Sequence, residues 1–346
     1  MKAYRNQAKP MNSYERYVNM IEGHQVDIVP RLPILMAFAA NFIGSDYAAF
    51  ASDYHVLVEA NIRCAEAFGI DQMNTMSDPY RETHGFGAEV EYVKDGVPRC
   101  LRPPFDDALD PGSIRKPDPL AAARMRDRIE AVREYKRRVG GQYSIMGWVE
   151  GPAAEAADLR GVENFLCDLI EEPSLTRELM DVCVDVAIDF ASIQVEDGVD
   201  TIGIGDAICS QMSAKMYHEL VWPHEQRLVN AIRAMGAYVR LHICGNSTHL
   251  LPFIAQLDLN IVDLDWMVDM RQARETLGTQ KVLTGNLDPV SVILRGTPDP
   301  IRRKFREIYA QVGNKYMVNA GCEIPLGTPP ENLRAVCEPI EAVPRY

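Results

Sequence analysis

Residues 238–265 read YVRLHICGNSTHLLPFIAQLDLNIVDLD and contain one complete strand–helix–strand unit. The runs at 238–243 and 261–265 are apolar and rich in β-branched residues, which is typical of buried strands. Between them, residues 248–256 carry apolar side chains at helical spacing. Parallel strands require a crossover connection of this kind, so the stretch predicts a parallel α/β sheet.

The same alternation extends from about residue 30 to the end of the chain. Strands are predicted at residues 31–37, 71–76, 143–149, 201–205, 238–243, 261–265, 282–284 and 316–320. Helices are predicted at residues 54–68, 119–138, 173–195, 213–235, 248–256, 270–277, 299–312 and 330–343. Eight strands, each followed by a helix, predict a closed (β/α)8 TIM barrel. An open Rossmann-type sheet would need a Gly-rich turn after an early strand, and the sequence has none.

Two additions to the barrel are predicted. A helical extension precedes it at the N-terminus, and an inserted hairpin and loop interrupt it near residues 89–118. The hairpin has short alternating runs on either side of Asp95-Gly96, a dipeptide that favours tight turns. The following residues are rich in Pro and Asp and predict a loop over one face of the barrel. No repeat or domain boundary is visible, so we expect a single domain over residues 1–346.

Composition excludes several classes of function. The chain has 346 residues and a formal net charge of −13, which would repel the phosphate backbone of nucleic acid. No run of about 18 apolar residues predicts a membrane span, and residues 1–14 lack the apolar region of a signal peptide. We therefore expect a cytoplasmic protein. Its eight cysteines are too sparse for a disulfide framework, so free thiols are expected, some of them binding metal.

The ends of two predicted strands carry metal-binding residue types. In a barrel, chemistry takes place where the strands end. His242 and Cys244 are two residues apart and therefore share one side of the strand. Cys322 follows the eighth strand, and closure of the barrel brings all strand ends around one mouth. One imidazole and two thiolates suit zinc and leave a fourth position open, as in catalytic sites. A strand-end His-x-Cys without metal is the alternative that these residues leave open.

Three segments resemble a known family. HICGN at 242–246, LTGNLDP at 283–289 and AGCEIPLGTPPENLRA at 320–335 are similar to the corrinoid-dependent methyltransferase branch of the uroporphyrinogen decarboxylase superfamily. That branch includes methylcobamide:coenzyme M methyltransferases and bacterial methyltransferases that act on methyl halides or aryl methyl ethers. The resemblance implies a barrel, zinc on His242, Cys244 and Cys322, and a corrinoid (methylcobalamin) supplied by a carrier protein.

Other polar and aromatic residues near strand ends are further candidates for the active site. Glu150 follows the third strand as a fourth ligand or proton acceptor, with a solvated loop carboxylate as the alternative. Asp206 closes the fourth strand, where it can orient His242 or a substrate. Large aromatic side chains more often pack in the core than line a site. The residues that can line a substrate or corrinoid pocket are nevertheless Tyr80, His84, Trp148, Asn246, Trp266 and Asn286.

We therefore expect a zinc-containing methyltransferase of one-carbon metabolism. It would move a methyl group between a small molecule (a methyl ether in an O-demethylation, or a thiol, amine or halide) and the cobalt of a partner protein's corrinoid. The sequence shows no cobalamin-carrier motif and no Gly-rich nucleotide loop. No motif identifies the methyl donor or acceptor, the direction of transfer or the fourth ligand. A homodimer is expected only because dimers are the commonest assembly.

Two alternative functions belong to other classes of protein. A metal-free decarboxylase of the porphyrinogen type would need a basic cleft for a substrate with many carboxylates. The segment VPRLPILMA at 29–37, where the decarboxylase has an Arg-rich motif, retains only Arg31. The second alternative is a barrel that serves as a binding module, in which zinc is structural or absent.

Overall fold

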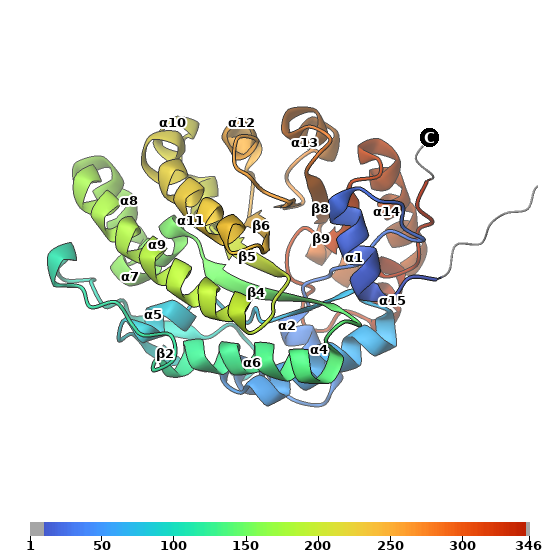
Figure 1. The fold of residues 1–346 in the computed structure, drawn as a ribbon, viewed down its shortest axis with the longest axis horizontal. Helices are drawn as coiled ribbons and strands as arrows, with labels where there is room; N and C mark the ends of the chain where they lie inside the picture. Colours follow the sequence, from blue (N-terminus) through green and yellow to red (C-terminus); the bar gives the residue numbers. More distant parts are fainter. Residues whose placement is uncertain (1–9, 344–346) are drawn as a thin grey trace, which may run out of the picture.

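The computed structural model describes residues 10–343, and a parallel sheet of seven strands forms its centre. The strand order is β1-β4-β5-β6-β7-β8-β9, so neighbours in the chain are neighbours in the sheet. Figure 1 shows the curled sheet with helices around its outer face. The strands are β1 (Gln72–Asn74), β4 (Ser144–Glu150), β5 (Thr201–Gly205), β6 (Tyr238–Ile243), β7 (Ile261–Leu264), β8 (Val282–Leu287) and β9 (Tyr316–Ala320).

Helices connect the strands and flank them. The α-helices are α1 (Ser13–Glu22), α2 (Met36–Phe42), α3 (Tyr47–Ser52), α4 (Tyr54–Phe68), α5 (Arg81–Gly85), α6 (Ala123–Val139), α7 (Pro152–Arg160), α8 (Val162–Glu171), α9 (Pro173–Glu196), α10 (Ala214–Met216), α11 (Trp222–Ala234), α12 (Leu251–Ile254), α13 (Met270–Leu277), α14 (Pro298–Val312) and α15 (Pro330–Val336). Short 3-10 turns lie at Pro111–Ser113, Ala207–Gln211 and Thr248–Leu250, and π-turns lie at Tyr217–Val221 and Pro289–Leu294.

The prediction of an eighth strand at residues 31–37 is wrong. This segment forms one parallel bridge, between Arg31 and Val318, and the chain turns into helix α2 at Met36. Pro30 and Pro33 have no backbone N–H and cannot donate to a ladder. The segment still contacts both edges of the sheet, because Leu32 donates to Val318 O at 2.7 Å and Asp71 donates to Arg31 O at 2.9 Å.

Several predicted helices have different bounds. The predicted helix at 248–256 is a 3-10 turn followed by the four-residue α12, and the C-terminal helix α15 ends at Val336, short of residue 343. The helix expected at 213–235 contains a π-turn between α10 and α11. Helices α2, α3, α5, α7 and α8 were not predicted. Helices α2 and α7 are short and buried on nearly every side, so they show no clear polar face.

The predicted N-terminal helix and inserted hairpin are confirmed. Helix α1 precedes the sheet, and strands β2 (Glu89–Glu91) and β3 (Arg99–Arg102) form an antiparallel hairpin in a separate two-stranded sheet. The turn of the hairpin reaches back to α3, where Tyr47 N–H donates to Lys94 O at 2.9 Å. A loop with one 3-10 turn follows as far as α6. The single domain over residues 1–346 stays a prediction.

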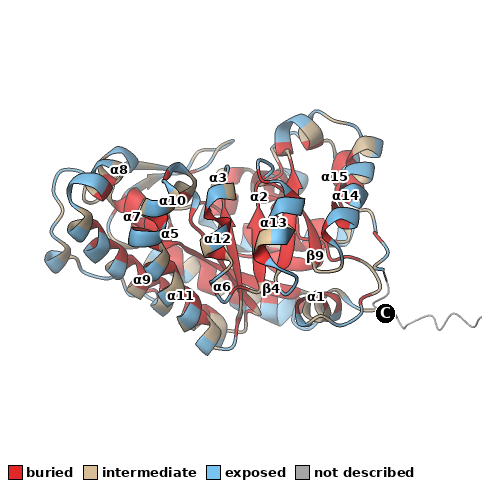
Figure 2. Ribbon diagram, turned by 90° about the horizontal axis from the view of Figure 1, so that it is seen from above, coloured by how far each residue is buried: buried red, intermediate tan, exposed pale blue. Residues whose placement is uncertain are grey.

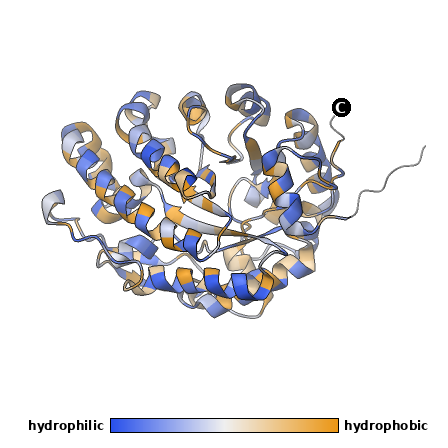
Figure 3. Ribbon diagram, in the orientation of Figure 1, coloured by the Kyte–Doolittle hydropathy of each residue, from blue (hydrophilic) through white to orange (hydrophobic). Residues whose placement is uncertain are grey.

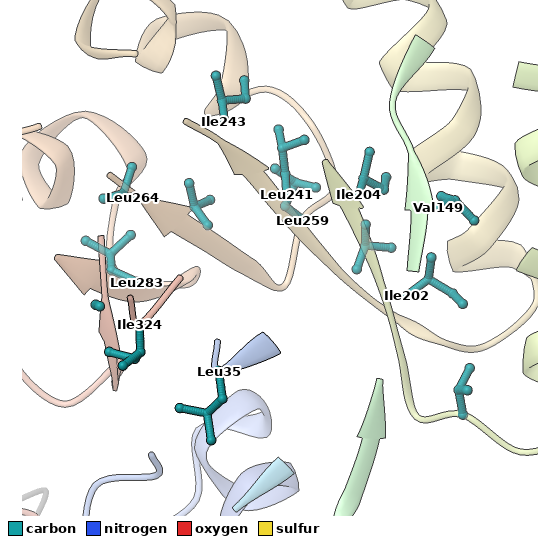
Figure 4. Close-up of a cluster of buried hydrophobic side chains, with 14 of the residues drawn as sticks. Leu35, Val149, Ile202, Ile204, Leu241, Ile243, Leu259, Leu264, Leu283 and Ile324 are labelled. Carbon is teal, nitrogen blue, oxygen red and sulfur yellow. The ribbon is translucent and has the colours of Figure 1, made fainter. Parts of the chain in front are cut away.

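The strands of the central sheet are buried on both faces along nearly their whole length. Figure 2 shows the strands buried and the outer faces of the helices exposed, and Figure 3 shows the matching polar and apolar stripes on those helices. Figure 4 shows the apolar layer between sheet and helices, which includes Val149, Ile204, Leu241, Leu264 and Leu283. Within residues 10–343, no helix is long and apolar enough to cross a membrane.

Ion pairs to Asp71 hold the start of the sheet to the segments beside it. Asp71 is fully buried, and it accepts from Arg16 of α1 at 2.6 Å and from Arg31 Nε at 3.0 Å. Both arginines are also nearly buried. The carboxylate therefore joins α1, the bridging segment and β1 in one charged cluster.

We predict that Asp71→Asn destabilises the fold by about 3–5 kcal/mol, because it leaves two buried guanidinium groups without their shared anion. Urea unfolding measures this change. The control is Asp107→Asn, which breaks the exposed pair with Arg102 and should change stability by less than about 1 kcal/mol. Equal effects for the two variants would show that the Asp71 cluster contributes no more than a surface pair.

Candidate metal site and active site

One imidazole and two thiols converge at the carboxyl ends of the strands. His242 lies in β6, Cys244 directly follows that strand, and Cys322 follows β9. His242 Nε2 lies 2.9 Å from Cys244 Sγ, which lies 3.7 Å from Cys322 Sγ. The potential ligand atoms of the three residues all lie within 4.8 Å of one another. This grouping is the one expected of a metal site with two sulfur ligands and one nitrogen ligand.

A second layer of polar side chains holds His242 from behind. Its Nδ1 atom lies 3.1 Å from Asp263 Oδ2, in the neighbouring strand β7. Asp263 is fixed in turn by Arg240 at 2.6 Å and by the Asn319 amide, which donates to Oδ1 at 3.0 Å. A carboxylate behind a histidine fixes the ring orientation and increases the basicity of the other nitrogen. The Nε2 atom therefore faces the two sulfur atoms.

The two thiols share protons unequally. The hydrogen bond between the two sulfurs lowers the pKa of Cys322 to about 4 and raises the pKa of Cys244 well above its usual value. Burial opposes a charged imidazole at His242, but Cys244 and Asp263 together raise its pKa well above the usual value. The protein thus stabilises the Cys322 thiolate beside the His242 imidazolium, and a bound metal ion would displace the protons of His242 and Cys244.

A pocket of about 220 Å³ opens beside these three residues. Its lining consists of Ile34, Met36, Met76, Asp78, Pro79, Trp148, Glu150, Gly205, Ala207, His242, Cys244, Cys322 and Glu323. Apolar side chains form one wall, and three carboxyl groups face the same space. The pocket is therefore a small, largely apolar chamber with the His-Cys-Cys group at one side.

Glu150 lines the pocket from the end of β4 and is nearly buried. Its Oε1 atom accepts from Arg81 Nη2 at 2.5 Å and from Trp148 Nε1 at 3.0 Å. Burial is the main cause that raises the pKa of Glu150 to about 8, and the nearby Glu82 adds to it, against the opposing effect of Arg81. The solvated loop carboxylate, the alternative reading of the sequence, does not describe this residue.

The other candidate residues lie in different places. The Asp206 side chain accepts from the N-terminal amides of α7, with Ala154 N at 2.7 Å, and only its backbone N–H reaches His242 O. Asn246 is exposed and accepts from Thr248 N. Trp266 and Asn286 line a separate hollow near α14, with Asn286 bonded to backbone carbonyls.

Tyr80 and His84 lie at helix α5, next to the pocket-lining Asp78, but outside the lining itself. The lining residues that sequence reasoning missed include Asp78 and Glu323. Asp78 follows β1 and Glu323 follows Cys322, so a survey of every polar residue after a strand would have found these two.

We predict that Cys322 in metal-stripped protein reacts with iodoacetamide faster than other cysteines at about pH 6, because its lowered pKa keeps it a thiolate there. Peptide mass mapping identifies the labelled residue. The exposed Cys167 and the buried Cys64 serve as internal controls. Labelling of Cys167 ahead of Cys322 would contradict the unequal sharing of protons between the two sulfurs.

Comparisons with known proteins agree with this fold. The family model described as uroporphyrinogen decarboxylase (URO-D) matches residues 12–343. A methylated-thiol–coenzyme M methyltransferase of Methanosarcina mazei is 26% identical, over 97% of this chain and 91% of its own length. A methylcobamide:CoM methyltransferase MtbA of the same organism is 29% identical, over 84% and 86%. A uroporphyrinogen decarboxylase of Gloeobacter violaceus is 26% identical, over 91% and 94%.

The fold also matches a solved structure. A methyltransferase from Methanosarcina mazei superimposes with a TM-score of 0.86 at 23% identity, covering 94% of this chain and 97% of the other. A likeness at this identity shows the fold alone, and it extends over nearly the whole chain. Because the family model spans residues 12–343, this chain belongs to the uroporphyrinogen decarboxylase (URO-D) family.

Proposed function

We propose that this chain is a zinc-dependent corrinoid methyltransferase. It would move a methyl group between a small molecule and the cobalt of a corrinoid carried by a separate protein. The observation that carries this proposal is the His242, Cys244 and Cys322 group at the side of an apolar pocket. The names of the similar methylcobamide:CoM methyltransferases support the reaction class.

The residues of the site fit a zinc ion. Two sulfurs and one imidazole nitrogen are ligands that zinc prefers, and Asp263 lies behind the imidazole as such sites require. Three protein ligands would leave one coordination position for a substrate, and all three ligand residues line the pocket. When bound, zinc acts as a Lewis acid that stabilises negative charge on a substrate sulfur or oxygen.

The pocket indicates how the two substrates would approach. Its volume of about 220 Å³ suits a small organic molecule but not a corrin ring. The corrinoid would therefore meet the small molecule from outside, at the mouth of the pocket, on a partner protein. The hairpin β2–β3 lies beside α3 through the contact between Tyr47 and Lys94, and this insertion is the candidate for contacts with that partner.

The electrostatics of the pocket disfavour a porphyrinogen decarboxylase, although similar proteins include enzymes of that name. The lining contains Asp78, Glu150 and Glu323 and no lysine or arginine. A substrate with several carboxylates therefore finds no cationic side chain in this lining to pair with. Arg31, the one arginine retained from the decarboxylase motif, is paired with the buried Asp71.

We predict about one zinc per chain in protein purified without added metal, and its loss in Cys322→Ser. A serine hydroxyl is a much poorer zinc ligand than a thiolate. Elemental analysis after gel filtration measures the ratio. The control is Cys167→Ser, which changes an exposed cysteine far from the pocket and should retain zinc. Folded wild-type protein that cannot be loaded with zinc would refute the proposed mechanism.

A second prediction concerns the support behind His242. Asp263→Asn should weaken zinc binding by roughly 10–100-fold, because it removes the charge that orients the imidazole and increases its basicity. Competition with a chromogenic chelator measures the affinity. The control is Asn332→Ala, which removes a buried side chain bonded to the backbone near Ile293, away from the pocket. If both variants bind zinc as tightly as the wild type, Asp263 does not support zinc binding by His242.

A further inference from the structure

Glu150 and His242 face each other across a glycine. The register of the parallel strands pairs Glu150 of β4 with Gly205 of β5, and Gly205 with His242 of β6. Paired residues of neighbouring strands project from the same face of a sheet. Glu150 and His242 therefore point into the same space, separated by two strand spacings, or roughly 10 Å.

The glycine keeps that space open. A Cβ atom at position 205 would lie 2.7 Å from the Trp148 ring and 3.3 Å from Glu150 Oε2. Any side chain at this position would fill the gap between the carboxyl group and the His-Cys-Cys group. The three paired residues, Glu150, Gly205 and His242, all line the same pocket. The gap is thus a place where a substrate can touch both sides at once.

The two oxygens of Glu150 have different surroundings. Oε1 accepts two hydrogen bonds, from Arg81 and from the indole of Trp148. Oε2 has no hydrogen-bond partner among residues 10–343, and it is the oxygen next to Gly205. A carboxyl group anchored through one oxygen presents the other, with or without its proton, to whatever occupies the gap.

The charges around Glu150 favour retention of a proton. Glu82 contacts Glu150 directly through the backbone N–H of Glu150, at 3.0 Å, and Arg81 is the cation that both carboxyls contact. Arg124 is engaged by Asp78. The ionisable groups that surround Glu150 from α5, α6, α7, the segment after β1 and the opposite side of the pocket are Arg81, Glu82, Arg124, Glu155, Asp158, Asp78, Glu323, His242, Cys244 and Cys322.

Carboxyl groups outnumber cations on the Glu150 side of this set. The pKa of Glu150 is raised to about 8, chiefly by burial, and the pKa values of Glu155 and Asp158 are raised well above their usual range by the same cause. A carboxyl group in this setting is protonated at neutral pH and becomes an acid that can give its proton to a neighbour.

We propose that Glu150 is the proton donor of the reaction and that the methyl group of the small molecule is carried on oxygen. This inference rests on the proposed function. The methyl carbon gains a bond to cobalt(I) of the partner's corrinoid, which supplies the electron pair, and it loses its bond to oxygen. The electron pair of the broken bond stays on the oxygen, which takes the proton from Glu150 Oε2. Water then returns a proton to the carboxylate.

The chemistry of the leaving group is the reason for oxygen. An alkoxide or phenoxide is a poor leaving group unless it is protonated or bound to a cation, whereas a thiolate or halide leaves without a proton. The apolar wall formed by Ile34, Met36, Met76 and Trp148 suits the hydrocarbon part of a methyl ether. Glu150 does not belong to the group of potential ligand atoms formed by the cysteines and His242, so its position is that of an acid opposite a metal site.

Methyl transfer from a series of methyl donors to free cob(I)alamin tests this proposal, with zinc-loaded protein and the corrinoid spectrum as the readout. Glu150→Gln should retain zinc and slow transfer from methoxybenzene by roughly 10²–10⁴-fold. The ratio of the wild-type rate to the variant rate should be smaller for nitro-substituted methoxybenzene, whose phenoxide is a better leaving group. For methylthiobenzene this ratio should approach 1. Glu225→Gln, which changes a fully buried carboxyl outside the pocket, should leave the rate unchanged.

Infrared spectroscopy provides a readout that does not depend on turnover. At neutral pH the wild type should show a protonated carboxyl stretch that is missing from Glu150→Gln and that disappears as the pH rises through the raised pKa. Absence of this band would overturn the inference and leave the proposed function intact. The same holds if Glu150→Gln slows all donors equally. A zinc-loaded wild type that transfers no methyl group from any donor would overturn the proposed function and the inference with it.

Discussion

The contact on which the site depends is between two sulfur atoms, those of Cys244 and Cys322, which lie 3.7 Å apart although 78 residues separate them. The curl of the sheet produces this contact, because β6 and β9 end at the same rim. A flat sheet would hold the two strand ends three strand spacings apart, roughly 14 Å. The fold therefore converts two distant cysteines and one histidine into a single group of ligands.

The inner face of the sheet is apolar near the amino ends of the strands and carries charged side chains nearer their carboxyl ends. Near the amino ends of the strands, Ile261, Val282 and Met317 pack against α1 in an apolar cluster. Nearer the carboxyl ends, Arg240 and Asp263 form a buried ion pair behind His242. Buried charges of this kind contribute little net stability compared with apolar packing. Their position indicates that they serve the orientation of the imidazole.

The sequence predicted much of the architecture and the central residues of the site. Seven of the eight strands, the N-terminal helix and the inserted hairpin follow from periodicity and turn residues. The segment at 31–37 was mispredicted because its apolar run resembles a strand, while its prolines limit it to one bridge. His242, Cys244 and Cys322 were named from strand-end positions and family resemblance, and the fold brings them together.

The surroundings of the site could not be read from the sequence in the same way. The contact of Arg81 in α5 with the Glu150 carboxyl in β4 joins separate segments, whose relative position is known only once the chain is folded. The role of Gly205 as an open space between two functional side chains likewise needs the pairing of three strands. Local patterns predict elements, whereas these contacts depend on tertiary packing.

X-ray absorption at the zinc edge, on the chain loaded with one equivalent of zinc, identifies the atoms that bind the metal. We expect two sulfur neighbours at about 2.3 Å and one nitrogen neighbour at about 2.0 Å, with a fourth light-atom ligand that a substrate can displace. A spectrum with only nitrogen and oxygen neighbours would contradict the account, because the metal would then lie away from Cys244 and Cys322.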